Sequence, residues 1–449
     1  MKQVQTVVIG AGPAGYEAAL QLAKAGIKTL LIDKSKEHIG GVCLNKGCIP
    51  TKNYLQYAEF AAKASFFGTR GLELEIKGLD IKELAMHTTS LKNELRSGVS
   101  WLLEQAGVEM LYGSASFVDN RHISVSDETI EFDHCIIATG SENKKVSEIP
   151  IDGKRIVSSD EIFQLETIPS SIVIIGGGFV GCEFATFFNA FGVDVTMIAR
   201  GTQLLSSEDE DVSKALLRAF KKRSINVLFS SKVLNTTTDE EGVELAINTE
   251  NEEHNIKCEL VLCATGRIPY TDGLQLENAE IKQSDKGFIE VNRSFQTTQE
   301  HIYAAGDCID TLGYAHVAYT EGKIAADNII FGEIKTNTHI APATIFSDPQ
   351  IATCGLSEKE AKRLGLEIDV KKAYFKANAK AKILGDDSGF IKIIIASQDR
   401  IVLGASVVGI EAVEIIHILT AAVERKVTLE ELAEMIYAHP TISEIIRNF

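Results

Sequence analysis

Apolar residues along this chain occur in short runs and in helical periods that predict alternating strands and helices. A run of β-branched residues at 4–9 ends in glycines, and a helical pattern at 16–25 and a second apolar run at 28–32 follow. The same order recurs from residue 171 to 198. Continuous apolar runs of this length are typical of parallel strands that helices cover on both faces. The pattern therefore predicts an α/β fold with two βαβ units.

Further patterns divide the rest of the chain. In chain order they predict strands at 132–137, 260–263, 302–304, 389–396 and 402–408. They also predict one helix that ends near residue 330 and two further helices at 413–425 and 429–436. The first two of these strands both lead into Ala-Thr-Gly. We expect boundaries near residues 145 and 267. After about residue 338 the pattern predicts an α+β domain without a glycine-rich turn.

The composition is that of a globular protein, and it argues against a nucleic-acid or membrane partner. A chain of 449 residues is too long for one core, and the net charge of −17 opposes nucleic-acid binding. No apolar run is long enough to span a bilayer, and no signal peptide precedes the first strand, so we expect a cytoplasmic protein. The eight cysteines lack the spacing of a secreted disulfide framework or of a zinc site, so no metal is expected.

Both glycine-rich turns have the spacing GxGxxG between a strand and a helix. The glycines are Gly10, Gly12 and Gly15 in the first turn, and Gly176, Gly178 and Gly181 in the second. In this context the spacing lets the backbone approach a pyrophosphate, which the helix N-terminus then faces. Asp33 follows Gly10 by 23 residues and ends the second strand, where a carboxylate can bind ribose hydroxyls. Two dinucleotide sites are therefore expected.

A pair of cysteines, Cys43 and Cys48, lies within thirty residues of the first turn, in Gly-Gly-Val-Cys-Leu-Asn-Lys-Gly-Cys-Ile-Pro-Thr-Lys. A dithiol beside a redox cofactor suggests electron transfer between that cofactor and a disulfide. The alternative is a pair of structural cysteines. The surrounding glycines and Pro50 argue against a buried regular helix or strand around them, which favours the redox interpretation.

Seven ordered motifs resemble those of the flavin-dependent pyridine nucleotide–disulfide oxidoreductases with a redox-active CxxxxC. They are the two GxGxxG turns, the cysteine segment at 40–52, ATGS at 138–141, ATGR at 264–267, AAGD at 304–307 and HPTxSE at 439–444. Among its members the chain is most similar to the dihydrolipoamide dehydrogenases. The wording CLNxGCIPTK and the segment 315–322 carry that closer likeness.

The resemblance implies three domains and two cofactors. Residues 1–145 and 267–337 would bind FAD tightly but non-covalently, 146–266 would bind NAD or NADP, and 338–449 would form a dimerisation domain. Candidate cofactor-binding residues beyond the six glycines and Asp33 are Lys52, Thr139, Gly140, Glu183, Arg200, Gly266 and Asp307. Lys52 and Glu183 would form an ion pair near the flavin, and Asp307 would bind its ribityl chain.

The resemblance also implies a catalytic relay in a homodimer. Cys48 would lie against the flavin, and Cys43 would exchange with the substrate sulfur. His439 of the partner subunit would act as the base, and Glu444 would orient it. The substrate would be a small dithiol or disulfide, such as the lipoyl groups of a 2-oxo acid dehydrogenase complex.

One position departs from the dihydrolipoamide dehydrogenase pattern. Twenty-three residues after Gly176 stands Ala199, where an NAD site normally has a carboxylate, and Arg200 follows it. A missing acid beside an arginine is typical of a 2′-phosphate site and favours NADP. An NADPH-dependent reductase similar to glutathione reductase or mercuric reductase is therefore the alternative. No C-terminal cysteine pair of the mercuric reductase kind occurs, and Thr51 stands where glutathione reductases have lysine.

Overall fold

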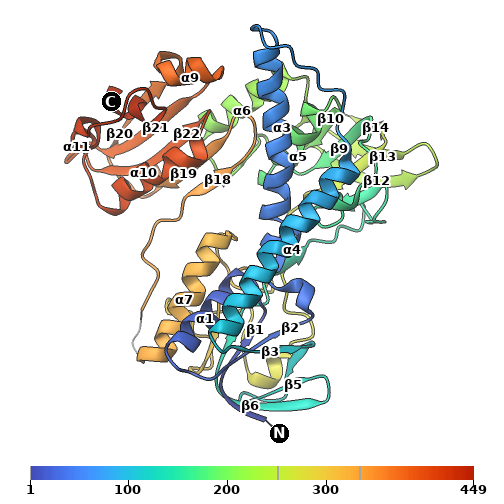
Figure 1. The fold of residues 1–449 in the computed structure, drawn as a ribbon, viewed down its shortest axis with the longest axis vertical. Coiled ribbons are helices and arrows are strands. Elements are labelled where there is room, and N and C mark those ends of the chain that lie inside the picture. The colour runs from blue at the N-terminus through green and yellow to red at the C-terminus, as the bar shows by residue number, and fades with distance from the viewer. Residues whose placement is uncertain (1, 250–251, 333–334) are drawn as a thin grey trace. The chain divides into compact units, whose positions relative to one another are not determined.

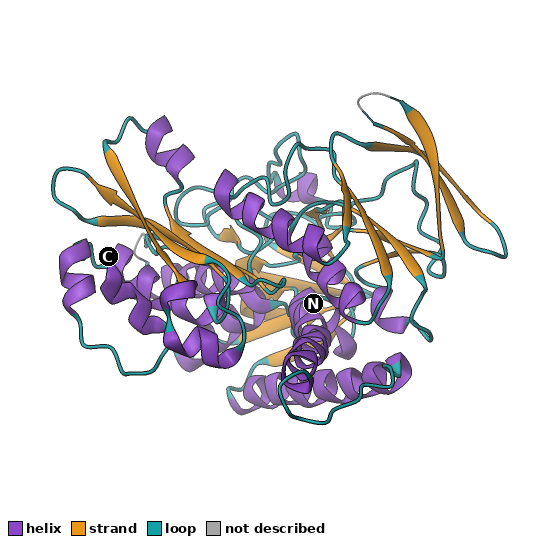
Figure 2. Cartoon of the chain, turned by 90° about the horizontal axis from the view of Figure 1, so that it is seen from above, coloured by secondary structure: helices purple, strands orange, loops and turns teal. Residues whose placement is uncertain are grey.

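The first strand, β1 (Lys2–Ile9), leads through the first glycine-rich turn into helix α1 (Pro13–Lys24) and strand β2 (Thr29–Asp33). This is the βαβ unit that the sequence predicts. In the computed structural model, which describes residues 2–249, 252–332 and 335–449, helices and strands are interspersed along the whole chain (Figure 2).

The chain divides into two units, and each is discontinuous in sequence (Figure 1). The first consists of Met1–Pro50, Ala85–Lys144 and Gly266–Thr338. The second consists of Thr51–Leu84, Lys145–Thr265 and His339–Phe449.

The first unit is built on a seven-stranded sheet in which β1 lies between β2 and β6, and β17 pairs with β6. All pairings among β1, β2, β3, β6 and β17 are parallel. Its other elements are α2 (Gly41–Lys46), α4 (Ile81–Gln105, from Ala85 on), β3 (Glu109–Tyr112), β4 (Ala115–Phe117), β5 (His122–Val125), β6 (Glu128–Ile137), β7 (Ser141–Asn143), β16 (Arg267–Pro269), β17 (Ile302–Ala304) and α7 (Ala315–Phe331). The carboxyl ends of β1 and β2 therefore meet at one edge of the sheet.

The second unit repeats this plan in a five-stranded parallel sheet of order β11-β10-β9-β15-β8. The elements of this part are α3 (Cys48–Gly68, from Thr51 on), β8 (Ile156–Ser158), β9 (Ser171–Ile175), α5 (Phe179–Ala190), β10 (Asp194–Ile198), α6 (Glu210–Lys222), β11 (Asn226–Leu228), β12 (Lys232–Thr238), β13 (Val243–Asn248), β14 (Glu253–Cys258) and β15 (Leu260–Cys263). Strands β12 to β14 form a separate antiparallel sheet.

The C-terminal part of the second unit is α+β, as the pattern after residue 338 predicts. Its elements are β18 (Ala343–Ile345), β19 (Ile351–Gly355), α8 (Glu358–Arg363), β20 (Ile368–Tyr374), α9 (Ala379–Leu384), β21 (Phe390–Ala396), β22 (Val402–Val408), α10 (Ala412–Glu424) and α11 (Leu429–Glu434). The five strands form an antiparallel sheet of order β18-β19-β22-β21-β20. Apolar residues of the sheet and of α10 share one buried core.

Both glycine-rich turns need glycine for the same steric reason. Gly10 has a φ of +102°, and a Cβ there would lie 2.3 Å from the carbonyl oxygen of Ala138. Gly176 has a φ of +130°, and its Cβ would lie 2.1 Å from the carbonyl oxygen of Ala264. The two Ala-Thr-Gly segments thus pack against the two turns, which explains why the sequence repeats them together.

Candidate active site residues

Asp33 is fixed at the end of β2 by backbone N–H groups. Its Oδ2 accepts a hydrogen bond from the Ala11 N–H at 2.6 Å, and its Oδ1 accepts one from the Lys34 N–H at 2.7 Å. Each carboxylate oxygen has two lone pairs, so both can still accept from a hydroxyl. This is the geometry that a ribose-binding carboxylate requires at this position.

Asp307 is held by a relay that the sequence did not reveal. Its Oδ2 accepts from the hydroxyl of Ser141 at 2.7 Å, and that hydroxyl accepts from Nε of Arg267 at 2.8 Å. Ser141 and Arg267 are the last residues of the ATGS and ATGR motifs, and β7 and β16 pair there in antiparallel fashion. The two repeated motifs therefore meet next to Asp307.

Tyr270 belongs to the environment of Thr139. The Thr139 hydroxyl donates to the carbonyl oxygen of Tyr270 at 2.6 Å. The Tyr270 hydroxyl is hydrogen-bonded to the ammonium of Lys34, which lies 4.1 Å from the centre of the tyrosine ring. Tyr270 thereby ties the Thr139 turn to the residue that follows Asp33. Gly140 and Gly266 flank this region with φ angles of +73° and +103°.

The two cysteines lie on helices, where the surrounding glycines and Pro50 suggested no buried regular helix or strand. Cys43 is in α2, and Cys48 is the first residue of α3. Pro50 is in the first turn of α3, where its missing N–H breaks no helical hydrogen bond. Both cysteine side chains are half-buried. Cys43 therefore lies in the middle of the short helix α2, Cys48 begins α3, and neither is packed into a core.

Asn45, between the cysteines, is a buried residue whose structural role was not predicted from the sequence. Its Nδ2 donates to the carbonyl oxygens of Gly41 at 2.8 Å and Ile39 at 3.0 Å. Its Oδ1 accepts from the guanidinium of Arg96 at 2.6 Å. A single amide thus fixes α2 from inside. The only signal in the sequence is that asparagine belongs to the wording CLNxGC.

In the second unit, Lys52 and Glu183 form the expected ion pair. The Lys52 ammonium lies 2.9 Å from both carboxylate oxygens of Glu183. The carboxylate is almost fully buried and also accepts from the Phe346 N–H at 3.0 Å. The ammonium lies 4.9 Å from the centre of the Phe346 ring. A buried carboxylate needs such partners.

The position that carries a carboxylate in NAD sites is occupied by Ala199, 23 residues after Gly176 of the second glycine-rich turn. Ala199 is buried directly after β10, and its carbonyl oxygen accepts from the Ser231 N–H at 3.1 Å. Arg200, the next residue, is exposed. At this strand end the chain therefore presents a cationic side chain and no carboxylate.

His439 and Glu444 form a hydrogen-bonded pair. Nδ1 of His439 lies 2.8 Å from Oε2 of Glu444, which is 10% exposed, while the imidazole is 70% exposed. Because Nδ1 is hydrogen-bonded to this carboxylate, Nε2 is the ring nitrogen that can act as the base. This arrangement suits a general base whose orientation a carboxylate fixes.

The candidate residues are divided between the two units of the chain. In the first unit are the glycines of the first turn, Asp33, Cys43, Cys48, Thr139, Gly140, Gly266 and Asp307. In the second unit are the glycines of the second turn, Lys52, Glu183, Arg200, His439 and Glu444.

Comparison with known proteins identifies the family. Residues 4–322 match the pyridine nucleotide-disulphide oxidoreductase family, and residues 341–448 match the dimerisation domain of that family. The chain belongs to the pyridine nucleotide-disulphide oxidoreductases.

Relatives of this oxidoreductase align over nearly its whole length. It is 35% identical over 447 residues to a dihydrolipoyl dehydrogenase of Staphylococcus aureus, with 99% of this chain and 95% of the relative covered. It is 34% identical over 451 residues to that of Haloferax volcanii, with 98% and 94% covered.

Two solved structures have a similar fold. The HOCl-induced flavoprotein disulfide reductase RclA of Escherichia coli is 26% identical with a TM-score of 0.89, covering 99% of this chain and 98% of that one. LpdA of Mycobacterium tuberculosis is 26% identical with a TM-score of 0.90, covering 99% of both.

Membership of the family establishes the class of reaction. The protein is a flavin-dependent disulfide oxidoreductase that uses FAD and NAD(P). The dimerisation domain supports a homodimer. Among the described residues, no helix is both long and apolar enough to cross a membrane.

The residues present fit both dinucleotides of this oxidoreductase. The N-caps of α1 and α5 are Gly12 and Gly178, and neither makes a side-chain cap hydrogen bond. Neither glycine offers a side-chain oxygen to the first turn of its helix, and a helix N-terminus can bind an anion such as a pyrophosphate through backbone N–H groups. Asp33 ends β2 and Arg200 follows the end of β10, so the chain carries opposite charges at these two strand ends.

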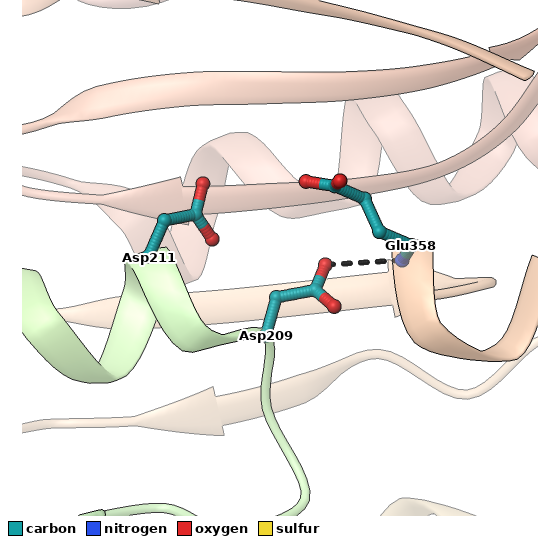
Figure 3. A group of neighbouring side chains, drawn as sticks. All are labelled: Asp209, Asp211 and Glu358. Atoms are coloured by element: carbon teal, nitrogen blue, oxygen red, sulfur yellow. Dashed lines mark hydrogen bonds between the residues drawn. The ribbon is translucent and has the colours of Figure 1, made fainter. Parts of the chain in front are cut away.

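One group of carboxylates has the spacing of a cation site, and the ammonium of a lysine pairs with all of its members. Asp209, Asp211 and Glu358 point toward one another from the start of α6 and the start of α8 (Figure 3). The ammonium of Lys392, which is 0% exposed, lies 2.7 Å from Asp209, 2.7 Å from Asp211 and 3.1 Å from Glu358. We therefore assign this cluster to the stability of the second unit.

We expect Lys392→Met to lower the free energy of unfolding by about 3 kcal/mol, because three carboxylates would lose their shared buried cation. Urea denaturation measures the loss. Lys362→Met is the matched control, since Lys362 pairs with the same Glu358 at 3.6 Å but is 69% exposed. That control is expected to change stability by at most about 0.5 kcal/mol. Equal losses in both variants would contradict the assignment.

The contribution of this cluster has a defined pH window. Burial by itself raises the pKa of Asp211, but ion pairs with Lys372 and Lys392 hold it below the usual 3.8. Burial by itself lowers the pKa of Lys392, but hydrogen bonds to Asp209 and Asp211 raise it above 10.5. The stability due to Asp211 is present above pH 3.8 and is lost as the pH falls through its folded pKa. The stability due to Lys392 is present below pH 10.5 and is lost as the pH rises through its folded pKa.

Proposed function

We propose that this flavin-dependent oxidoreductase moves two electrons between dihydrolipoamide, or a similar small dithiol, and a nicotinamide through Cys43 and Cys48. The observation that carries the proposal is the position of the cysteine pair against the first dinucleotide turn. The Gly40 N–H, next to α2, donates to the carbonyl oxygen of Ala11 at 2.8 Å. The names of the relatives in Staphylococcus aureus and Haloferax volcanii support the choice of dithiol.

The proposed roles follow the domain division inferred from the sequence. Residues 1–145 and 267–337 would bind FAD through the first turn, Asp33 and Asp307, and 146–266 would bind NAD(P) through the second. Residues 338–449 would form the dimer interface and present His439 to the partner's cysteines. When bound, FAD supplies a two-electron carrier between a dithiol and a nicotinamide. A cytoplasmic location remains a prediction.

The cysteines and the histidine account for the thiol chemistry. Nε2 of His439 takes the proton of a substrate thiol, and the resulting thiolate attacks the sulfur of Cys43. The Cys43–Cys48 bond breaks and Cys48 leaves as a thiolate. The second thiol of the substrate then attacks the substrate sulfur that is bonded to Cys43. That bond breaks, and Cys43 is released with the proton of the attacking thiol. The substrate is oxidised to its disulfide, and the cysteine pair holds the two electrons.

A substrate panel tests this proposal. The purified holoenzyme is assayed with lipoamide, glutathione disulfide, mercuric ion and Cu(II), each with NADH and with NADPH. We expect the highest kcat/KM with lipoamide. A kcat/KM for lipoamide below that for another acceptor would overturn the choice of substrate and leave the family assignment intact.

The second candidate is an NADPH-dependent reductase of another disulfide or of a metal ion. Ala199 and Arg200 at the end of β10 favour it, because they offer a 2′-phosphate a cation and no competing carboxylate. The likeness to RclA, of which a Cu(II) complex is known, supports this kind of reductase.

If Arg200 binds a 2′-phosphate, Arg200→Glu lowers kcat/KM for NADPH by about 10-fold to 100-fold, the loss of one charged hydrogen bond. The value for NADH changes much less, because NADH has no such phosphate. Arg218→Glu is the control, since Arg218 is an exposed arginine on α6. Steady-state kinetics give kcat/KM of each variant relative to wild type, once with NADH and once with NADPH. If the wild-type enzyme prefers NADH and the Arg200→Glu variant keeps the same preference, Arg200 does not bind a 2′-phosphate.

A further inference from the structure

Two neighbouring residues of the segment 315–322, Glu321 and Gly322, are not used by the chemistry above. Both are buried in helix α7, and the side chain of Glu321 is part of a residue that is only 4% exposed. Burying a carboxylate is costly unless hydrogen bonds compensate the loss of water. The hydrogen-bond partners of Glu321 therefore indicate which part of the structure it holds.

Gly322 brings α7 into direct backbone contact with α1. A Cβ on Gly322 would lie 2.1 Å from the carbonyl oxygen of Ala14, which is in the first turn of α1. Only glycine permits two backbones to approach so closely. Figure 1 shows α1 and α7 side by side. The place of Glu321, the preceding residue of α7, is therefore fixed relative to the helix that follows the first dinucleotide turn.

Both carboxylate oxygens of Glu321 accept hydrogen bonds from the segment that follows β17. Oε2 accepts from the N–H of Gly306 at 2.8 Å, and Oε1 accepts from the hydroxyl of Thr311 at 2.6 Å. Hydrogen bonds to an ionised acceptor are stronger than those between neutral groups. Residues 306–311, which we call the Asp307 loop, are thereby tied to α7 at their first and last members.

Asp307 lies directly after the first of these attachments. Gly306 has a φ of +75°, and a Cβ there would lie 3.3 Å from the Cβ of Ala14. The backbone turn at Gly306 sets the direction in which the chain continues into Asp307. The Asp307 carboxylate itself accepts from the Ser141 hydroxyl at 2.7 Å. Glu321 thus holds the backbone next to Asp307, and Ser141 holds its side chain.

We propose that Glu321 is a positioning residue for FAD, because it fixes the loop that presents the Asp307 carboxylate to the cofactor. The inference rests on the proposed function, in which Asp307 binds FAD. Its consequence is that FAD leaves the protein faster when residue 321 can no longer accept the two hydrogen bonds.

The test measures the rate at which the purified holoenzyme exchanges its FAD for labelled FAD in excess. In Glu321→Leu we expect release to be about tenfold faster, the effect of one hydrogen bond to a charged group. In Glu321→Gln the rate should stay within about threefold of wild type. The amide oxygen can still accept from Gly306, and the amide N–H can donate to the hydroxyl oxygen of Thr311.

A mutant cycle with Asp307 distinguishes positioning from a general loss of stability. If Glu321 acts through Asp307, Glu321→Leu should change the release rate by less than about twofold in an Asp307→Asn background. A glutamate with a merely structural role would give the same factor in both backgrounds, and that result would overturn the proposal. Thr311→Val removes one of the two hydrogen bonds with little change in size. It carries the same cycle if the Glu321→Leu chain does not fold.

Asn328→Leu is the matched control. Asn328 lies on the same helix and is also 4% exposed, and its Nδ2 donates to the carbonyl oxygen of Ser294 at 3.0 Å. We expect this variant to unfold at a lower urea concentration than wild type and to release FAD at the wild-type rate. Faster release from Asn328→Leu, to the same extent as from Glu321→Leu, would mean that any damage to α7 loosens the flavin, and would overturn the proposal.

The outcomes also separate this inference from the proposed function. If Asp307→Asn releases FAD at the wild-type rate, Asp307 does not bind FAD as proposed, and this inference fails with that assignment. If Asp307→Asn releases FAD faster but Glu321→Leu does not, only the role of Glu321 is overturned.

Discussion

Cys43→Ser and Cys48→Ser are each expected to lower lipoamide turnover by roughly 10⁴-fold or more, because serine can form no disulfide and covalent exchange has no substitute. Both variants should still bind flavin, since serine is close to cysteine in size and the glycines of the first dinucleotide turn and Asp33 are unchanged. Steady-state turnover and the visible flavin spectrum measure the two expectations. Lipoamide turnover that persisted in both variants would sink the mechanism.

Buried cysteines provide the matched control. Burial raises the pKa of Cys354 and of Cys258, each to about 11, so neither is a reactive thiolate at neutral pH. Cys354→Ala should therefore keep wild-type turnover. A loss of turnover in Cys354→Ala as large as in Cys43→Ser would indicate that cysteine substitution acts through folding.

His439→Gln is expected to lower kcat with lipoamide by about 10²-fold to 10⁴-fold, the usual contribution of a general base. Glutamine cannot take the substrate proton at the place of Nε2. Glu444→Gln should cost less, because it weakens the 2.8 Å hydrogen bond that orients the ring but leaves the base in place. An activity of His439→Gln within twofold of wild type would remove it from the mechanism.

Subunit mixing tests whether the histidine serves the partner's cysteines. In a heterodimer of a Cys43→Ser chain and a His439→Gln chain, one site would carry both changes and the other neither. Equal co-expression of the two chains should then restore about a quarter of wild-type activity, since half of the dimers would have one intact site. If base and cysteine came from the same chain, every site would carry one change and no activity would return.

The sequence predicted the elements around the turns well, because their strands are continuous apolar runs and their glycines are sterically required. Strands β1, β2, β9 and β10 and helices α1 and α5 are where the pattern places them. It failed at the cysteine segment. Gly47 and Pro50 suggest irregular chain there, whereas two helices meet end to end and proline is harmless in the first turn. It also contained no sign of the buried lysine cluster around Lys392.

By itself, the sequence determined the α/β class, two dinucleotide turns, the redox cysteines and the His439–Glu444 motif. These features are encoded in residues close together along the chain, where spacing and side-chain chemistry are enough. Only the tertiary structure decided which distant residues contact them: Ser141 and Arg267 next to Asp307, and Tyr270 on Lys34. Those partners lie on separate strands and helices, and their approach depends on sheet order and helix crossing, which no local pattern records.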